Sequence, residues 1–301
     1  MQQLHRILVG HDFRAGGEVA VSSAAALAAR YRAALRLVHV VEPPHLYQRL
    51  SHPLTAPYSP EELAQQAGTA LETIAAGSRL EHLSVEYEVH TGKPFVELIV
   101  ARRAWNADLI VVGGSGQGEE PGLGRTSERV VRKAMVPVLI AKAPFSAQAK
   151  TLLVPTDFST GARKAAEEAL TLAAGFGARV IFLHAIDVSH IYAATTGADM
   201  PALPPPPVVE AQDLELEWEA FLSDLPLLQQ LAWERRTVTG LAASAIVQQA
   251  KERQADLLVI GTHGRTGLAH MLLGGVTEEV IRTARCPVLT IRPDAFQFEL
   301  P

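Results

Sequence analysis

The chain has 301 residues, of which 48% are hydrophobic and 20% charged, and its formal net charge is −5. This length suggests two domains with sizeable cores, and the acidic balance argues against a general nucleic-acid binder. No stretch reaches the ~18 consecutive apolar residues of a membrane span, and the N-terminus lacks the pattern of a secretory signal. The single cysteine excludes an intrachain disulfide. We therefore expect a cytoplasmic protein without membrane contact.

The first half of the chain alternates strand and helix patterns. An apolar run over residues 5–13 is followed by an alanine-rich helical stretch at 16–31 and an apolar run at 34–42. After a variable segment and a helix come a strand at 84–90, a helix at 94–104 and the apolar run DLIVV at 108–112. A glycine-rich loop, a helix and a last strand over 136–142 complete this half.

The second half repeats the first. TLLVPTDFS at 151–159 resembles HRILVGHDF at 5–13, and QADLLVIGTHG at 254–264 resembles NADLIVVGGSG at 106–116. The offset between equivalent residues drifts from 145 for Asp12 and Asp157 to 150 for Pro137 and Pro287, as changes in loop length would produce. The sequence therefore predicts two tandem domains, at 1–145 and 150–294.

Alternating strands and helices, with nearly continuous Val, Ile and Leu in the strands, indicate a parallel sheet that is buried on both faces. We predict an α/β fold of two doubly wound domains. Each has a mainly parallel five-stranded sheet with helices on both faces. Ser159 or Thr160 is expected to cap the second alanine-rich helix, and Gly175 or Gly177 to end it. The proline-rich stretch at 201–207 is interpreted as a stiff surface loop, with a motif for a proline-binding partner as the alternative.

The segment from Gly261 to Thr277 joins a buried strand to a helix and is rich in glycine. In doubly wound sheets, ligands bind beyond the carboxyl ends of the strands, where a helix N-terminus offers unpaired N–H groups to phosphate oxygens. Glycines allow the backbone to come close to such a ligand. The spacing matches neither the Walker A loop nor the GxGxxG fingerprint, because two residues separate Gly261 from Gly264 and nine separate Gly264 from Gly274.

This spacing resembles the ATP-binding signature G-x2-G-x9-G-[ST] of the universal stress protein family. The resemblance covers both halves, so the chain looks like a tandem member with a Rossmann-like, adenine-nucleotide alpha-hydrolase-like fold. It implies that ATP, with Mg²⁺ bridging its phosphates, is the ligand. One departure is Gly275, which stands where the family has Ser or Thr. The residues that the resemblance and the neighbouring loop assign to this site are Pro155, Thr156, Asp157, Ala185, Gly261, His263, Gly264, Arg265, Gly274, Gly275, Val276 and Thr277.

The first half departs further from this signature. Only seven residues separate Gly116 from Gly124, and Arg125 occupies the Ser/Thr position. The formal charge from Gly113 to Arg125 is −1, whereas that from Gly261 to Gly275 is +1. We therefore expect the second half to bind ATP well and the first weakly or not at all. The candidate residues of the first half are Asp12, Val40, Gly113, Gly116, Gly124, Arg125 and Ser127.

The sequence offers no convincing catalytic base near the phosphates and no metal-ligand spacing of histidines. We expect a nucleotide-dependent stress-response protein with an unidentified protein partner. In the family, the last strand forms the dimer. We therefore expect the two last strands to pair within the chain as a pseudo-dimer, and two chains to form a homodimer. Three alternatives stay open, namely a slow ATPase, an adenylating enzyme and a nucleotide-free interaction protein. For the glycine loops, tight turns without a ligand are a further alternative. Asp12 and Asp157 are interpreted as caps of the following helices as well as ligand contacts, since the two roles are compatible. His39 and His184 lie in apolar strands and are interpreted as core histidines instead of ligands.

Overall fold

The computed structural model describes residues 4–43, 59–114, 122–146, 148–187, 211–264 and 273–293. Near residue 147 the chain divides into two compact units, here called the first and second unit. Gly116, Arg265 and the proline-rich stretch at 201–207 lie outside the described residues. None of the helices in the described part combines the length and apolarity that a membrane crossing requires.

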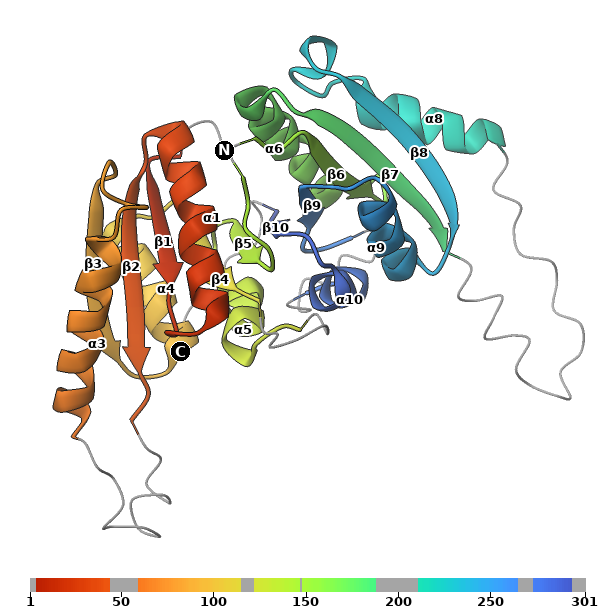
Figure 1. Ribbon diagram of the computed structural model, residues 1–301. Helices are drawn as coiled ribbons and strands as arrows, with labels where there is room; N and C mark the ends of the chain where they lie inside the picture. The colour runs from red at the N-terminus through yellow and green to blue at the C-terminus, as the bar shows by residue number, and fades with distance from the viewer. Residues whose placement is uncertain are drawn as a thin grey trace, which may run out of the picture. The chain divides into compact units, whose positions relative to one another are not determined.

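The first unit is a five-stranded parallel sheet in the order β3-β2-β1-β4-β5. Helix α1 covers one face, while α4 and α5 pack against each other on the opposite face (Figure 1). The elements are β1 (Arg6–Gly10), α1 (Ala15–Tyr31), β2 (Ala34–Val41), α3 (Pro60–Ala75), β3 (Val85–Thr91), α4 (Pro94–Trp105), β4 (Leu109–Gly113), α5 (Arg125–Lys133) and β5 (Val138–Ala141).

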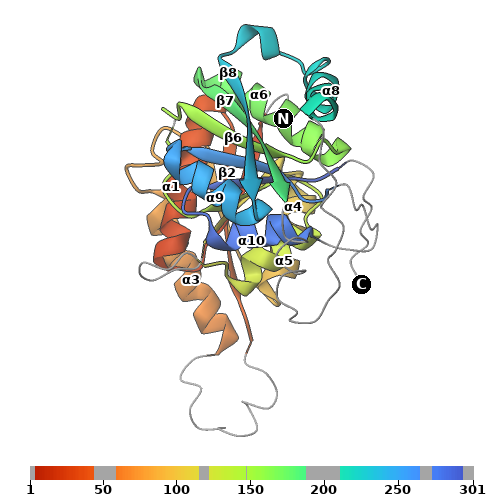
Figure 2. The same ribbon diagram turned by 90° about the vertical axis from the view of Figure 1, so that its right-hand side faces the viewer.

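The second unit repeats this arrangement in the order β10-β9-β6-β7-β8, again with parallel pairing. Helices α6 and α8 lie on one face and α9 and α10 on the other (Figure 2). The elements are β6 (Thr151–Thr156), α6 (Thr160–Phe176), β7 (Arg179–Asp187), α8 (Ala211–Leu222), a 3₁₀ turn (Leu228–Gln230), β8 (Trp233–Gly240), α9 (Ala242–Glu252), β9 (Leu257–Gly261), α10 (Gly275–Thr283) and β10 (Val288–Ile291). The predicted fold class is confirmed.

The central strands are buried along their length, which explains their unbroken apolar sequences. In β1, Ile7, Leu8 and Val9 are each 0% exposed, and all five residues of β9 are buried. A strand that is covered on both faces has no solvent side, so its sequence shows no polar alternation. These strands form the core of each unit and hold the loops at their carboxyl ends in place.

Local signals in the sequence set the ends of α6. The Ser159 side chain accepts a hydrogen bond of 3.2 Å from the N–H of Ala162, and Gly177 ends the helix with a φ of +67°. Both features were predicted from residue type. By contrast, α1 begins after Arg14, which makes no side-chain cap. The start of α1 therefore differs from that of α6 although the helices occupy equivalent places.

In each unit, an aspartate just before the fourth strand in chain order binds the backbone at the start of the first strand. Asp108 accepts hydrogen bonds of 2.8 and 2.9 Å from the backbone N–H groups that open β1. Asp256 accepts bonds of 2.8 and 3.0 Å from those that open β6. The internal repeat in the sequence is therefore reproduced at the level of single contacts.

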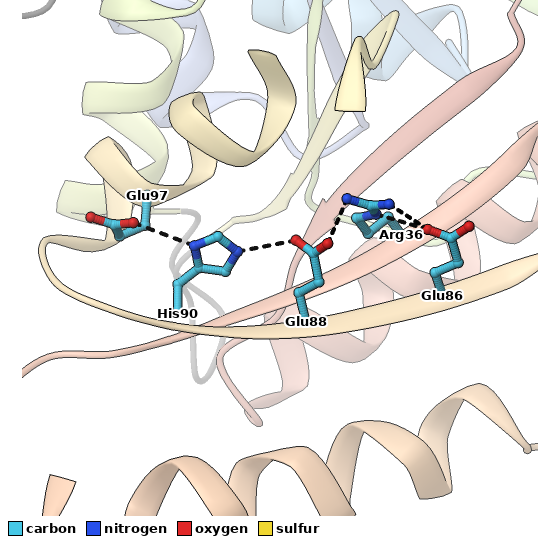
Figure 3. Close-up of polar contacts among 5 residues, drawn as sticks. All are labelled: Arg36, Glu86, Glu88, His90 and Glu97. Carbon is cyan, nitrogen blue, oxygen red and sulfur yellow. Dashed lines mark hydrogen bonds and ion pairs between the residues drawn. The ribbon is translucent and has the colours of Figure 1, made fainter. Parts of the chain in front are cut away.

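The edge strand β3 carries a row of charged side chains (Figure 3). Arg36 on β2 lies 2.5 Å from Glu86 and 2.6 Å from Glu88, and His90 lies between Glu88 and Glu97 at 3.1 and 3.4 Å. Charges on an edge strand discourage pairing with another chain. These contacts therefore suit an outer strand.

Candidate functional site

The second unit contains a cavity of about 310 Å³ at the carboxyl ends of β6, β7 and β9, beside the N-terminus of α10. This is the place where doubly wound sheets bind ligands. Of the twelve residues predicted for this site, all but Arg265, which lies outside the described residues, line the cavity: Pro155, Thr156, Asp157, Ala185, Gly261, His263, Gly264, Gly274, Gly275, Val276 and Thr277.

The apolar wall of this cavity was not predicted. It is formed by Ala162, Leu183, Ala242, Ile246 and Ile260. The spacing of Ala242 and Ile246 puts both on one face of α9, which is a signal that the sequence did contain. An apolar wall with a few polar groups suits a flat, largely apolar ring that also carries polar atoms.

The N-terminus of α10 borders the cavity. Gly274 is its N-cap, with extended backbone angles of −70° and 141°, and the first helical hydrogen bond runs from Glu278 N–H to Gly274 at 2.9 Å. The N–H groups of residues 275–277 therefore have no partner within the helix. Such a turn attracts anions, because its N–H groups and the helix dipole both favour negative charge.

Packing within the unit restricts two of the glycines, one against backbone and one against a side chain. A Cβ on Gly261 would lie 2.9 Å from the carbonyl oxygen of Gly161 in the first turn of α6. A Cβ on Gly264 would collide with the carboxylate of Asp157. By contrast, a Cβ on Gly275 would meet nothing within 4 Å. Gly261 thus has a structural cause besides any ligand, whereas the contact at Gly264 is only with the end of the Asp157 side chain.

The Thr277 side chain has a structural role of its own. Its hydroxyl donates a hydrogen bond of 2.8 Å to the carbonyl oxygen of Gly261, and the residue is 5% exposed. In the first unit, Ser127 makes the equivalent bond to Gly113, also at 2.8 Å. The Thr277 hydroxyl proton is therefore already engaged, so this residue does not replace the hydroxyl that is lost at Gly275.

Asp157 is held in place by the turn that follows β6. Its Oδ1 accepts a hydrogen bond of 3.1 Å from Ser159 N–H, and Phe158 N–H donates to Thr156 Oγ1 at 2.9 Å. Phe158 has a φ of +63°. Because Ser159 is the N-cap of α6, Asp157 fixes the turn before the helix instead of capping it.

The first unit has an equivalent cavity of about 290 Å³. Apart from Gly116, which lies outside the described residues, the predicted residues of this unit line it: Asp12, Val40, Gly113, Gly124, Arg125 and Ser127. Its wall also contains His11 and Arg14, which sequence reasoning missed. Aligning VPTDFS with VGHDFR shows that they stand where the second unit has Thr156 and Ser159.

The described walls of the two cavities differ in charge. The first contains Asp12 with Arg14 and Arg125, whereas the second contains Asp157 and no Lys or Arg. The described wall of the first cavity is thus more positive than that of the second, whereas the formal charges of the two loops predicted the reverse. The reason is that Glu119, Glu120 and Arg265, which set the loop charges, lie outside the described residues, and Arg14 was not counted.

The strand histidines contact backbone groups in both units. Nδ1 of His39 lies 2.8 Å from the carbonyl oxygen of His11, and Nδ1 of His184 lies 2.9 Å from that of Thr156. Phe13 and Phe158 pack on these rings at centroid distances of 4.4 and 4.5 Å. These contacts agree with the interpretation of both histidines as structural residues.

In the part of the chain that the structure describes, no group of three or more His, Cys, Asp or Glu side chains could hold a metal ion. The only carboxylate among the described residues of the second cavity is Asp157. The described walls of the second cavity therefore combine an apolar surface and hydrogen-bond donors with a single carboxylate.

Each unit has a parallel α/β sheet covered on both faces and a cavity at the carboxyl ends of its strands, so the chain is a tandem protein of the Rossmann-like α/β class. The sequence model of the universal stress protein family matches residues 3–142 and 148–292. The chain therefore belongs to the universal stress protein family, with two such domains in tandem.

Several relatives match most of the chain. A universal stress protein of Mycobacterium tuberculosis strain H37Rv is 30% identical over 303 residues, which are 95% of this chain and 96% of that protein. The crystal structure of a universal stress protein from Archaeoglobus fulgidus DSM 4304 covers 95% of this chain and 98% of its own, at a TM-score of 0.70 and 21% identity. At that identity the likeness shows the fold alone. A universal stress protein solved in complex with cAMP is 26% identical over 48% of this chain and 97% of its own, at a TM-score of 0.33.

Proposed function

We propose that the second unit binds an adenine nucleotide, ATP with Mg²⁺, in the cavity beside α10, and that the protein acts in the cytoplasm as a nucleotide-dependent regulator of the stress response. The observation that carries this proposal is the convergence of eleven predicted residues on one cavity. Its volume of about 310 Å³ falls within the usual range for small-molecule sites, about 300–1,000 Å³.

The chemistry of the cavity supports this assignment. The apolar wall around Ile246 and Ile260 suits a purine ring, and Asp157 can accept hydrogen bonds from a ribose. The N-terminal turn of α10 suits the phosphates. Mg²⁺ would be held by the phosphates, since the described residues supply no metal cluster of their own. In this proposal nucleotide binding changes the interactions of the protein, and catalysis is not required.

Calorimetric titration of the full chain with ATP and Mg²⁺ tests the binding. We expect one site of micromolar affinity, roughly −8 kcal/mol, that is lost in Gly274→Val. A Cβ at Gly274 would approach Thr262 O to 3.4 Å, an ordinary contact, so the backbone leaves room for a Cβ at this position. The matched control is Gly124→Val, which alters the equivalent N-cap in the first unit and should leave the site intact. No heat of binding in the wild-type protein would contradict the proposal.

The first cavity is expected to bind ATP weakly or not at all, because its loop is two residues shorter than the family spacing. The number of sites in the same titration tests this expectation, and two equal sites would contradict it. The regulatory role requires that ATP favour one state of the protein over another. Small-angle scattering and partner capture that do not change at saturating ATP would contradict that part of the proposal.

A further inference from the structure

The turns after β1 and β6 share a backbone shape but differ in one polar side chain. Phe13 and Phe158 both have positive φ, at +57° and +63°. The N–H of Phe158 donates to the hydroxyl of Thr156 at 2.9 Å, whereas the N–H of Phe13 donates to Nδ1 of His11 at 3.2 Å. The first unit thus holds its turn with a titratable group where the second uses a hydroxyl.

The bond from Phe13 fixes the tautomer of His11. A ring nitrogen that accepts a hydrogen bond carries no proton, so the neutral imidazole has its proton on Nε2. Nε2 lies 3.3 Å from Glu18 Oε1, and the His11 side chain is 1% exposed. Gly17 lies against this ring, since a Cβ there would be 2.9 Å from His11 Cδ2 and 3.0 Å from Nε2, and it would also be 2.9 Å from Asp12 Oδ1. His11 and Gly17 stand where the second unit has Thr156 and Ala162.

The charged and titratable groups around His11 come from three sides. Glu18 lies on α1, where its second oxygen binds Arg79 at 2.9 Å; Asp12 follows in the turn, and His39 approaches from β2. Burial lowers the pKa of His11, and the carboxylates of Glu18 and Asp12 oppose this shift. At neutral pH the ring is therefore uncharged and accepts the Phe13 bond.

We propose that protonation of His11 releases the turn at residues 11–14, which forms part of the wall of the first cavity. A protonated Nδ1 cannot accept the Phe13 N–H, and two N–H groups would then face each other. Asp12 lies in the middle of this turn, with its Oδ1 bound to Arg14 N–H at 3.1 Å, so its carboxylate loses its fixed position in the cavity. The second cavity does not respond, since Thr156 does not titrate. This inference does not depend on nucleotide binding.

Amide hydrogen exchange of the full chain, resolved at Phe13 and Phe158 and corrected for intrinsic rates, tests the proposal between about pH 8 and pH 5. The protection of Phe13 should fall by up to about tenfold per pH unit between the ordinary histidine pKa of about 6.5 and the lowered pKa of the folded imidazole, because opening takes up one proton in that window, and it should level off below the folded pKa. Phe158 serves as an internal control and should keep its protection. Equal pH dependence of the two amides would overturn the proposal.

Two variants sharpen this test. The double substitution His11→Thr with Gly17→Ala installs the residue pair of the second unit, and Phe13 should then behave like Phe158. His11→Gln keeps a hydrogen-bond acceptor without titration and guards against a folding defect in the double variant. The ¹⁵N shift of Nδ1 in the wild-type protein should change at the pH where the loss of Phe13 protection levels off. Loss of Phe13 protection at acidic pH in either variant would also overturn the proposal.

Discussion

Gly261 at the end of β9 lies against Gly161 in the first turn of α6, so closely that a Cβ on Gly261 would be 2.9 Å from the Gly161 carbonyl oxygen. The first unit has the same relationship, since a Cβ on Gly113 would lie 2.5 Å from the Gly16 carbonyl group. In both units the first loop glycine lets a strand and a helix approach at the edge of the cavity.

Gly261→Ala should therefore destabilise the second unit by about 1–3 kcal/mol, the usual range for overpacking against a backbone that cannot move. Gly275→Ala in the same segment is the matched control and should change stability by less than about 0.5 kcal/mol, because its Cβ would meet nothing within 4 Å. Urea unfolding in a Trp105→Phe background measures this, since the other two of the three tryptophans, Trp218 and Trp233, lie in the second unit. Equal effects of the two substitutions would contradict the packing argument.

Thr277→Val should cost about 1–3 kcal/mol of stability, because it leaves the buried carbonyl of Gly261 without its donor. Thr277→Ser keeps the hydroxyl and corresponds to Ser127 in the first unit, so it should retain most of the stability. The same urea experiment measures both variants. If Val and Ser at this position were equally stable, the hydrogen bond would contribute nothing to the fold.

The fold could be predicted from the sequence because its signals are local and repeated. Buried parallel strands have continuous apolar runs, and Ser159 and Gly177 mark the ends of α6 by residue type. The cavity residues were predictable where the glycine spacing and the family resemblance gave positions. The pairing of the two last strands and the homodimer stay predictions.

What the sequence did not reveal depends on three-dimensional contacts. The role of Gly261 follows from the approach of Gly161, about a hundred residues away. In the sequence, His11 is only one residue of the apolar run at 5–13, and its role follows from the contacts of its ring with Phe13 N–H and Gly17. Arg14 lies outside the glycine loop in the sequence, just before α1, yet it lines the first cavity, so the formal charge of the loop did not include it.

Lowering the pH should weaken the first unit through His11. Burial lowers the pKa of His11 in the folded protein below 6.5, so the unfolded chain binds the proton first. The contribution of neutral His11 to stability is therefore present above about pH 6.5 and is lost as the pH falls through the folded pKa. Urea midpoints at about pH 7.5 and pH 5.5 should differ more in the wild-type protein than in His11→Gln. An equal difference would assign the pH dependence to other groups.

Gly275→Ser should strengthen nucleotide binding if the second cavity is the ATP site. The substitution restores the hydroxyl that the family signature has after its last glycine, and the Cβ position is free of contacts within 4 Å. One added hydrogen bond contributes about 0.5–1.5 kcal/mol, which corresponds to roughly a two- to tenfold lower Kd. Gly275→Ala separates this effect from the change in backbone freedom at the start of α10, and calorimetry with ATP and Mg²⁺ measures both variants. Ser and Ala binding with equal affinity would mean that the phosphates do not reach position 275, and the ligand would then have to lie deeper, along the wall formed by Ile246 and Ile260.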